Sequence, residues 1–246
     1  MLKVRSIRRR GGAVLACALV TGSCLVGGSA VSTAAVPQQE LALLKPAMRC
    51  GDLQHADVSG PVGATTHITR AEEVSKPGTK PYCQVEGVID PHIKFELHLP
   101  TAGWTQRYLQ VGCGGLCGSL QIRLEHAHGC VPADRGEIAV ASTDMGHSGG
   151  GGAWAAEDPG AKVDFGYRGV HLTALAAKGL IARYYNQAPR YSYFSGCSDG
   201  GREALIEAQR FPDDFAGIAA GAPALNFTVQ NSFYHGWNAI SNTAAD

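Results

Sequence analysis

Apolar and polar residues alternate along the segment IKFELHL, residues 93–99. A period of two residues is typical of a strand that buries one face and exposes the other. A second strand candidate, residues 84–89, lies just before it, and the Asp-Pro-His segment at 90–92 predicts a turn between the two. We therefore expect two strands joined by a turn over residues 84–99.

Four further apolar runs are short and are separated by long connections. The segment 169–185 lies in one of these connections and predicts a buried helix. Strands that alternate with helical connections are typical of a mostly parallel sheet with crossover helices. We therefore expect an α/β fold with about six strands. The four additional strands are expected at residues 108–111, 138–143, 191–195 and 215–220.

The segment GCSDG, residues 196–200, lies between a predicted strand and a helical pattern over residues 202–211. Gly-x-Ser-x-Gly in this context is typical of a nucleophile elbow, a tight turn that projects the serine hydroxyl above the sheet. Ser198 is therefore the predicted nucleophile. The backbone N–H of Asp199 is the predicted first donor of an oxyanion hole, which stabilises the charge of a tetrahedral intermediate.

A glycine-rich segment, GCGG at residues 112–115, follows the third predicted strand. In hydrolases with a nucleophile elbow this loop supplies the second oxyanion donor, and glycine lets the backbone approach a substrate oxygen closely. Gly114 is the first choice for this donor and Gly115 the second. An ordinary glycine-rich turn is the alternative. A phosphate-binding loop is not expected, because no Lys-Ser/Thr pair follows.

The elbow is one of several distinctive segments that follow one another along the chain. They are TDMGH at 143–147, DFGYRGVH at 164–171, SYFSGCSDGGR at 192–202, EAQRFP at 207–212, DFAGI at 214–218 and GAPA at 221–224. Together these segments resemble the tannase and feruloyl esterase family, which also includes an enzyme that acts on a terephthalate monoester. The likeness covers roughly residues 45–240 and includes Cys197 directly before Ser198, which is unusual in a general lipase or esterase.

The resemblance implies an α/β-hydrolase fold and a serine esterase whose substrates are esters of aromatic acids such as ferulate or gallate. A small aromatic ester is then the expected partner, and no cofactor is implied. In the family, the cysteine before the nucleophile is bonded to a cysteine directly after the catalytic histidine, which implies such a partner for Cys197. The resemblance also implies a disulfide between Cys50 and Cys83, which ties the N-terminal segment to the first strand.

The number of predicted strands is smaller than an α/β-hydrolase sheet needs. That sheet usually has about eight strands, and its catalytic residues follow the chain order Ser, acid, His. The predicted strands end shortly before Asp246. We therefore expect residues 36–246 to be the N-terminal portion of a catalytic domain, with the last strands, the acid, the histidine and the lid domain beyond this chain. On this interpretation the 246 residues alone lack significant esterase activity.

Nine histidines are present, and none lies in the family position of the catalytic base. His147 follows the fourth predicted strand and is the one expected at the sheet edge where the site forms. We expect it to hydrogen-bond locally in a loop, with substrate contact as the alternative. His171 begins a predicted helix and is expected to be structural.

Residues 1–35 predict a secretory signal. Five basic residues within the first ten precede a short apolar stretch, residues 13–26, and small residues follow. The stretch is too short for a good membrane span. The mature chain is therefore expected to be secreted and not to associate with a membrane.

The charge balance excludes one class of partner. The sequence has 21 acidic and 21 basic residues, and its net charge is zero. A nucleic-acid partner is therefore not expected, because such a protein needs an excess of basic residues. The sequence carries no signal for an oligomeric state.

Export makes disulfides the expected state of the cysteines. Two of the eight cysteines lie in the predicted signal. After the pairs implied by the resemblance, Cys113, Cys117 and Cys130 form an odd set, in which a Cys117–Cys130 disulfide is favoured. A zinc site that includes His126 and His128 is the alternative. Export and the residue spacing disfavour it, so no metal ligand is predicted.

Two other functions stay open. The chain would be an inactive fragment or a secreted binding protein if the fold were kept without catalysis. A third possibility is another hydrolase class with the same fold, such as a secreted serine peptidase, although Cys197 before the nucleophile argues against that class. An acid and a His-Cys pair encoded beyond Asp246 would favour the esterase.

Overall fold

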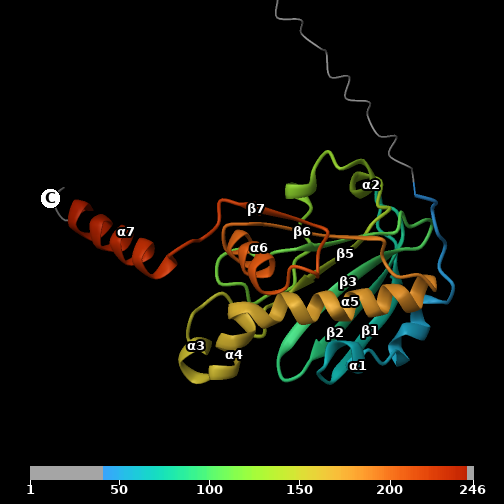
Figure 1. Ribbon diagram of the computed structural model, residues 1–246, viewed down its shortest axis with the longest axis horizontal. Coiled ribbons are helices and arrows are strands. Elements are labelled where there is room, and N and C mark those ends of the chain that lie inside the picture. The colour runs from blue at the N-terminus through green and yellow to red at the C-terminus, as the bar shows by residue number, and fades with distance from the viewer. Residues whose placement is uncertain (1–40, 243–246) are drawn as a thin grey trace, which may run out of the picture. The chain divides into compact units, whose positions relative to one another are not determined.

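The computed structural model describes residues 41–242 of the chain (Figure 1). The predicted signal, residues 1–35, lies outside this range. Among the described helices, none combines the length and the apolar character needed to cross a membrane.

A seven-stranded mixed sheet is the centre of an α/β-hydrolase fold, as expected. The strand order is β1-β2-β3-β5-β4-β6-β7. Strands β1, β2, β3 and β5 pair antiparallel in that order, and β5, β4, β6 and β7 pair parallel. The strands are β1 (Thr66–Val74), β2 (Tyr82–Ile89), β3 (Ile93–Pro100), β4 (Arg107–Val111), β5 (Ala139–Thr143), β6 (Tyr191–Cys197) and β7 (Gly217–Gly221).

Helices fill the connections between the parallel strands. The long helix α5 crosses the sheet in Figure 1 and contacts β3 and β5. The helices are α1 (Ser59–Val62), α2 (Val131–Asp134), α3 (Trp154–Glu157), α4 (Pro159–Val163), α5 (Gly169–Tyr185), α6 (Asp199–Arg210) and α7 (Phe227–Asn242), with 3-10 turns η1 (Cys50–His55) and η2 (Glu125–Ala127) and a π turn η3 (Asp164–Arg168).

The alternating segment forms β3 as the pattern predicts. Ile89 of β2 pairs with Ile93 of β3 across the turn at residues 90–92. Every second residue of β3 from Ile93 to Leu99 is buried, so the apolar face of the hairpin packs into the core. The predicted buried helix over residues 169–185 is also confirmed, as α5.

Strand β1 is not predicted by the hydrophobic pattern, and it brings the sheet to seven strands rather than about six. It lies at the edge of the sheet and pairs only with β2 among the described strands. Thr66 is its one buried residue. A strand with a single neighbour and little burial needs no apolar face, so its polar sequence carries no clear strand signal.

The parallel strand β4 is buried on both faces. Gln110 faces α5, and its amide donates to the carbonyl of Val170 at 3.0 Å. Leu109 and Val111 belong to a separate apolar cluster with Val140 of β5. Burial on both faces explains why this strand is a short, mostly apolar run without strict alternation.

Two disulfides lie in the described part of the chain. Cys50 pairs with Cys83, as the resemblance implies, and joins η1 to β2. Cys113 pairs with Cys117, so the predicted Cys117–Cys130 disulfide is wrong. The turn after β4 brings the Cα atoms of Cys113 and Cys117 to 5.3 Å, within the range for a disulfide. Cys130 instead precedes α2, where it is exposed and unpaired.

Candidate active site

Ser198 lies on the turn between β6 and α6, and it is exposed. Its φ of 62° and ψ of −115° form a backbone conformation that residues other than glycine rarely adopt. The amide of Ser198 donates to the Gly221 carbonyl at 3.1 Å, and the Ala224 amide donates to the Ser198 carbonyl at 3.1 Å. The end of β7 and the following loop thereby hold the geometry expected of a nucleophile elbow.

Two of the glycines around Ser198 lie where another backbone segment comes too close to admit a side chain. A Cβ atom on Gly196 would lie 2.4 Å from the carbonyl oxygen of Gly200. A Cβ atom on Gly201 would lie 2.3 Å from the carbonyl oxygen of Gly221. Both obstacles are backbone atoms, so no side-chain movement relieves them. The glycine pattern is thus a packing requirement of the turn.

The glycine-rich loop after β4 packs against the first turn of α6. The amide of Gly200 donates to the carbonyl of Cys113 at 2.8 Å, and a Cβ atom on Gly112 would lie 2.6 Å from Gly200 Cα. Gly114 follows Cys113 in the loop, and Asp199 precedes Gly200 in the helix. The two predicted oxyanion donors therefore lie on segments that are hydrogen-bonded to each other.

The space around Gly114 is open, unlike that around the neighbouring Gly112. Apart from its chain neighbours, no described atom lies within 4 Å of the point where a Cβ atom of Gly114 would stand. An open backbone amide beside the elbow suits the approach of a substrate oxygen.

Three acidic residues lie on one buried face of α6. Asp199, Glu203 and Glu207 are only 6%, 2% and 0% exposed. Glu203 Oε1 lies 2.7 Å from Cys113 Sγ, and Asp199 Oδ2 lies 3.3 Å from Cys117 Sγ. Burial raises the pKa of Glu203 well above its usual range, and the adjacent Asp199 carboxylate adds to this. Because the bonded sulfurs carry no proton, a protonated Glu203 is the donor in its sulfur contact.

Sequence analysis does not single out Glu203 or Glu207. The available signal is their spacing of four and eight residues from Asp199, which places all three on one side of a helix. Burial and the nearby Asp214 carboxylate raise the pKa of Glu207 to about 8.

Ser198 opens onto a pocket of about 300 Å³. The loop after β7 and the first turns of α7 line it, and α7 itself has no buried residue among those described. The wall combines aromatic rings with side-chain amides, a composition that suits an aromatic ligand with a few polar groups. Besides Ser198, the lining includes Pro223, Phe227, Gln230, Asn231 and Tyr234.

The family model described as tannase and feruloyl esterase matches residues 77–246. The chain belongs to this family. An uncharacterized esterase of Xanthomonas campestris is 42% identical over 163 residues, which cover 64% of this chain and 27% of that protein. Feruloyl esterase B of Aspergillus niger is 31% identical over 212 residues, which cover 78% of this chain and 39% of that protein.

A solved structure supports the same assignment. Feruloyl esterase B from Aspergillus oryzae matches with a TM-score of 0.56 and 28% identity, over 66% of this chain and 35% of that one. A mono(2-hydroxyethyl) terephthalate hydrolase of Piscinibacter sakaiensis is 35% identical over 161 residues, which cover 58% of this chain and 26% of that protein. The chain thus spans well under half the length of these carboxylic ester hydrolases.

In this member of the tannase and feruloyl esterase family, the DFGYRGVH segment packs against the elbow helix. The Arg202 guanidinium lies 4.3 Å from the centre of the Phe165 ring and donates to the Phe165 carbonyl at 3.1 Å. It also donates to both oxygens of Asp199, at 2.7 and 3.0 Å. Asp164 is buried and pairs with Arg168 at 2.9 Å. The segment therefore holds Arg202 and, through it, Asp199 in place.

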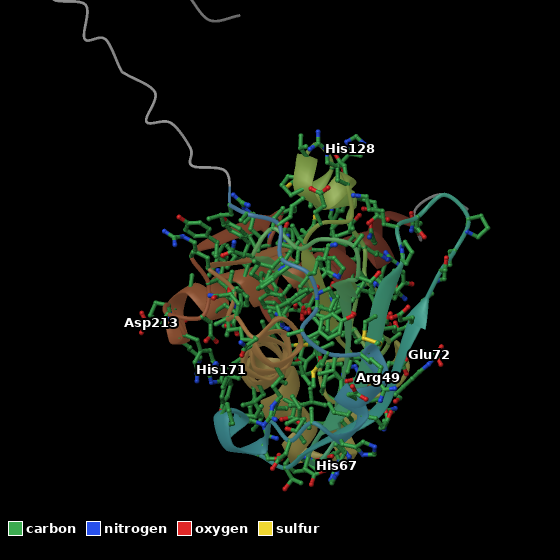
Figure 2. The ribbon with its side chains drawn as sticks, turned by 90° about the vertical axis from the view of Figure 1, so that its right-hand side faces the viewer. Arg49, His67, Glu72, His128, His171 and Asp213 are labelled. Carbon is green, nitrogen blue, oxygen red and sulfur yellow. A yellow bond between two sulfur atoms is a disulfide. The ribbon has the colours of Figure 1, made fainter. Side chains whose placement is uncertain are left out.

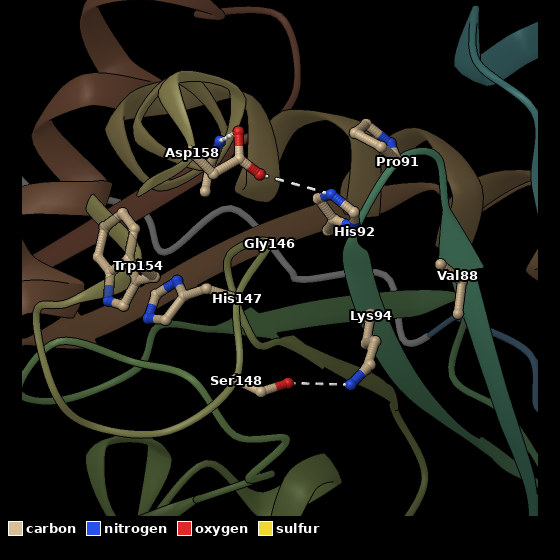
Figure 3. Close-up of a pocket in the computed structure, with 10 residues that line it drawn as sticks. Val88, Pro91, His92, Lys94, Gly146, His147, Ser148, Trp154 and Asp158 are labelled. Atoms are coloured by element: carbon tan, nitrogen blue, oxygen red, sulfur yellow. Dashed lines mark hydrogen bonds and ion pairs between the residues drawn. The ribbon is translucent and has the colours of Figure 1, made fainter. Parts of the chain in front are cut away.

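His147 lines a second pocket, of about 330 Å³, and hydrogen-bonds to the loop after β4 (Figure 3). Its Nε2 donates to the Leu116 carbonyl at 2.6 Å, and its ring stacks on Trp154 with 4.0 Å between centroids. Lys94 and Ser148 are hydrogen-bonded at 3.0 Å on the other side of the pocket. Because Leu116 belongs to the loop after β4, His147 fastens that loop to the end of β5.

Two predicted partners of the elbow are not seen beside it among the described residues. No imidazole described in the structure is hydrogen-bonded to Ser198. Cys197 is half-buried and bonds no described cysteine. Its pairing with a cysteine next to the catalytic histidine stays a prediction, as do the roles of Ser198, Asp199 and Gly114.

Proposed function

We propose that this chain is the nucleophile-bearing part of a secreted serine esterase that hydrolyses esters of aromatic acids, of the feruloyl or galloyl type. The observation that carries the proposal is the backbone of Ser198, with φ 62° on an exposed turn that opens onto a pocket. Strained conformations of this kind persist at functional sites because the surrounding structure holds them.

In the proposed reaction, Ser198 Oγ attacks the ester carbonyl and forms a tetrahedral intermediate. A histidine takes the hydroxyl proton and delivers it to the leaving alcohol, and a carboxylate orients that histidine. The amides of Asp199 and Gly114 donate to the oxyanion. Water then attacks the acyl-enzyme with the same histidine as base, which releases the aromatic acid and restores Ser198.

The histidine and the carboxylate are expected in sequence that follows Asp246. The absence of a described imidazole at Ser198 supports this expectation, and so does the family order of catalytic residues. A serine hydroxyl without an adjacent base is a weak nucleophile. We therefore propose that residues 1–246 alone do not turn over substrate.

The pocket beside Ser198 supports an aromatic substrate. The rings of Phe227 and Tyr234 offer faces for an aromatic acid, and the amides of Gln230 and Asn231 offer hydrogen bonds to its ring substituents. Two relatives carry names that state such substrates, a feruloyl esterase and a terephthalate monoester hydrolase.

Secretion is proposed from the N-terminal segment and the disulfides. Residues 1–35 have the order of charged, apolar and small residues found in export signals. The Cys50–Cys83 disulfide suits an oxidising compartment.

The deciding experiment uses a longer protein that includes the residues encoded after Asp246. It is assayed on methyl ferulate and methyl gallate. Ser198→Ala is expected to lower kcat by about 10⁴- to 10⁶-fold. A fluorophosphonate is expected to label Ser198 and no other serine. Labelling of a different serine would overturn the assignment of the nucleophile. Saturable binding of both esters without any hydrolysis would favour the alternative, a secreted binding protein of the same fold.

A further inference from the structure

Three potential metal ligands converge at the end of α6 that lies away from Ser198. His171 comes from the first turn of α5, Glu207 from the last turn of α6, and Asp214 from the turn before β7. One donor atom of each lies within 4.8 Å of the other two. His171 Nδ1 is 2.5 Å from Asp214 Oδ2. In Figure 2, His171 lies near the molecular surface on the same side as Asp213, the neighbour of Asp214.

Glu207 is the member of this cluster that the protein leaves unsatisfied. Its side chain is 0% exposed, and neither carboxylate oxygen has a hydrogen-bond partner among the described residues. A buried carboxylate without a partner is costly, and such groups in native proteins are usually paired or bound to a metal. The position of Glu207 beside two other ligand types points to a cation as the missing partner.

The charges that face the cluster leave room for a cation. Among the described residues, Lys178 is the Lys or Arg whose ion pair with the cluster is seen: its Nζ lies 3.5 Å from Asp214 Oδ1 and donates to the Asp214 carbonyl. Lys178 pairs with Asp214, so Glu207 has no ion-pair or hydrogen-bond partner among the described residues, and a bound cation would stabilise its charged form. The Phe211 ring stacks on His171 at 3.8 Å and fixes the plane of the imidazole. The His171 side chain is 24% exposed, which gives an ion access from solvent.

We propose that His171, Glu207 and Asp214 form a binding site for a divalent transition-metal ion, with Zn²⁺ as the preferred ion. One imidazole nitrogen and two carboxylate oxygens are a donor set that zinc accepts, with water as the fourth ligand. Mg²⁺ and Ca²⁺ prefer oxygen ligands alone. On binding, the ion takes the place of the proton at His171 Nδ1 while the neutral imidazole keeps one proton, at Nε2, and Glu207 binds as a carboxylate after its proton leaves to solvent.

The bound ion would join three elements that the chain brings together only by folding. It would hold the start of α5, the end of α6 and the turn before β7. Because α6 begins directly after Ser198, the ion would stabilise the helix behind the elbow without contact to the reacting atoms. The inference concerns binding alone and does not depend on the proposed esterase activity.

Isothermal titration calorimetry of zinc binding tests the proposal. The full chain is first stripped of metal by a chelator, and its free thiols are alkylated. Alkylation removes Cys130 and Cys197 as competing ligands. One ion should bind per chain, and Glu207→Gln and His171→Gln should each weaken binding at least tenfold. His67→Gln is the matched control: His67 lies 3.9 Å from Asp90 in an exposed His–Asp pair. This variant should bind like the unsubstituted protein, and millimolar Mg²⁺ should not compete.

X-ray absorption spectroscopy at the zinc edge, recorded on the unsubstituted protein loaded with zinc, gives a readout that does not depend on how the variants fold. The expected first shell is one imidazole nitrogen with oxygen donors at about 2.0–2.2 Å and no sulfur. A thermal midpoint raised by about 5–10 °C at a hundredfold excess over Kd would agree with it. Unchanged affinity in both cluster variants, a sulfur shell, or no binding at a hundredfold excess of zinc would overturn the proposal.

Discussion

The carbonyl oxygen of Cys113 accepts a 2.8 Å hydrogen bond from the amide of Gly200. This contact joins the loop after β4 to the first turn of α6, two segments that are far apart in the sequence. Gly114 follows Cys113 and Asp199 precedes Gly200, so these two residues lie on adjacent backbone segments. An oxyanion hole needs donors from two such segments at a fixed separation.

The close approach of these two segments is expected to make Gly112 intolerant of a side chain. A Cβ atom there would lie 2.6 Å from Gly200 Cα, a backbone atom that cannot rotate away. Gly112→Ala should lower the free energy of unfolding by about 1–3 kcal/mol, measured in urea. Gly114→Ala is the control, because its Cβ atom meets open space. Equal losses of stability in the two variants would contradict the packing seen at Gly112.

The buried carboxyl of Glu203 is expected to make stability depend on pH. Its folded-state pKa is raised well above 4.5 by burial. Between 4.5 and the raised value, the folded protein keeps a proton that the unfolded chain has lost. The free energy of unfolding therefore falls as pH rises, by about 1 kcal/mol per pH unit.

Glu203→Gln removes this titration and tests the effect. The variant should show a flatter pH dependence of its thermal midpoint from about pH 5 to about pH 7 and should exceed the unsubstituted protein in stability at pH 7. Glu72→Gln is the control, because Glu72 is exposed and its pKa is lowered by Arg70. A slope for Glu203→Gln equal to that of the unsubstituted protein would show that Glu203 does not keep its proton.

Peptide mapping under non-reducing conditions should find Cys113 bonded to Cys117 and Cys50 bonded to Cys83. Cys130 is exposed and should react with iodoacetamide in the folded protein. Loss of the short Cys113–Cys117 loop in a double serine variant should cost about 2 kcal/mol of stability. A peptide that joins Cys117 to Cys130 would restore the pairing that the sequence favoured.

Residues 1–246 alone should not hydrolyse methyl ferulate, methyl gallate or a short nitrophenyl ester at enzymatic rates. The reason is that a serine needs an adjacent base, and no described imidazole is hydrogen-bonded to Ser198. Rapid turnover that Ser198→Ala abolishes would show that a base exists within these residues. His147→Gln would then be the first variant to assay, because His147 lies at the carboxyl end of β5.

Local sequence determines those features of this protein whose physical requirements are local. The alternation of residues 93–99 specifies a strand with one buried face, and β3 has that face. The bounds of α5 agree with the predicted segment 169–185, which is largely apolar, has no proline and has one interior glycine, Gly179. The glycines at 196 and 201 are readable because the turn around Ser198 admits no Cβ atom at either position.

Tertiary structure decides the features that depend on residues distant in the chain. Strand β1 is held by its pairing with β2, and its exposed polar residues give no pattern of their own. Cys117 pairs with Cys113 because of the turn after β4, which no count of cysteines reveals. His171 and Asp214 meet only when α5 and the turn before β7 pack against α6. Such contacts arise from three-dimensional packing, so sequence spacing alone does not specify them.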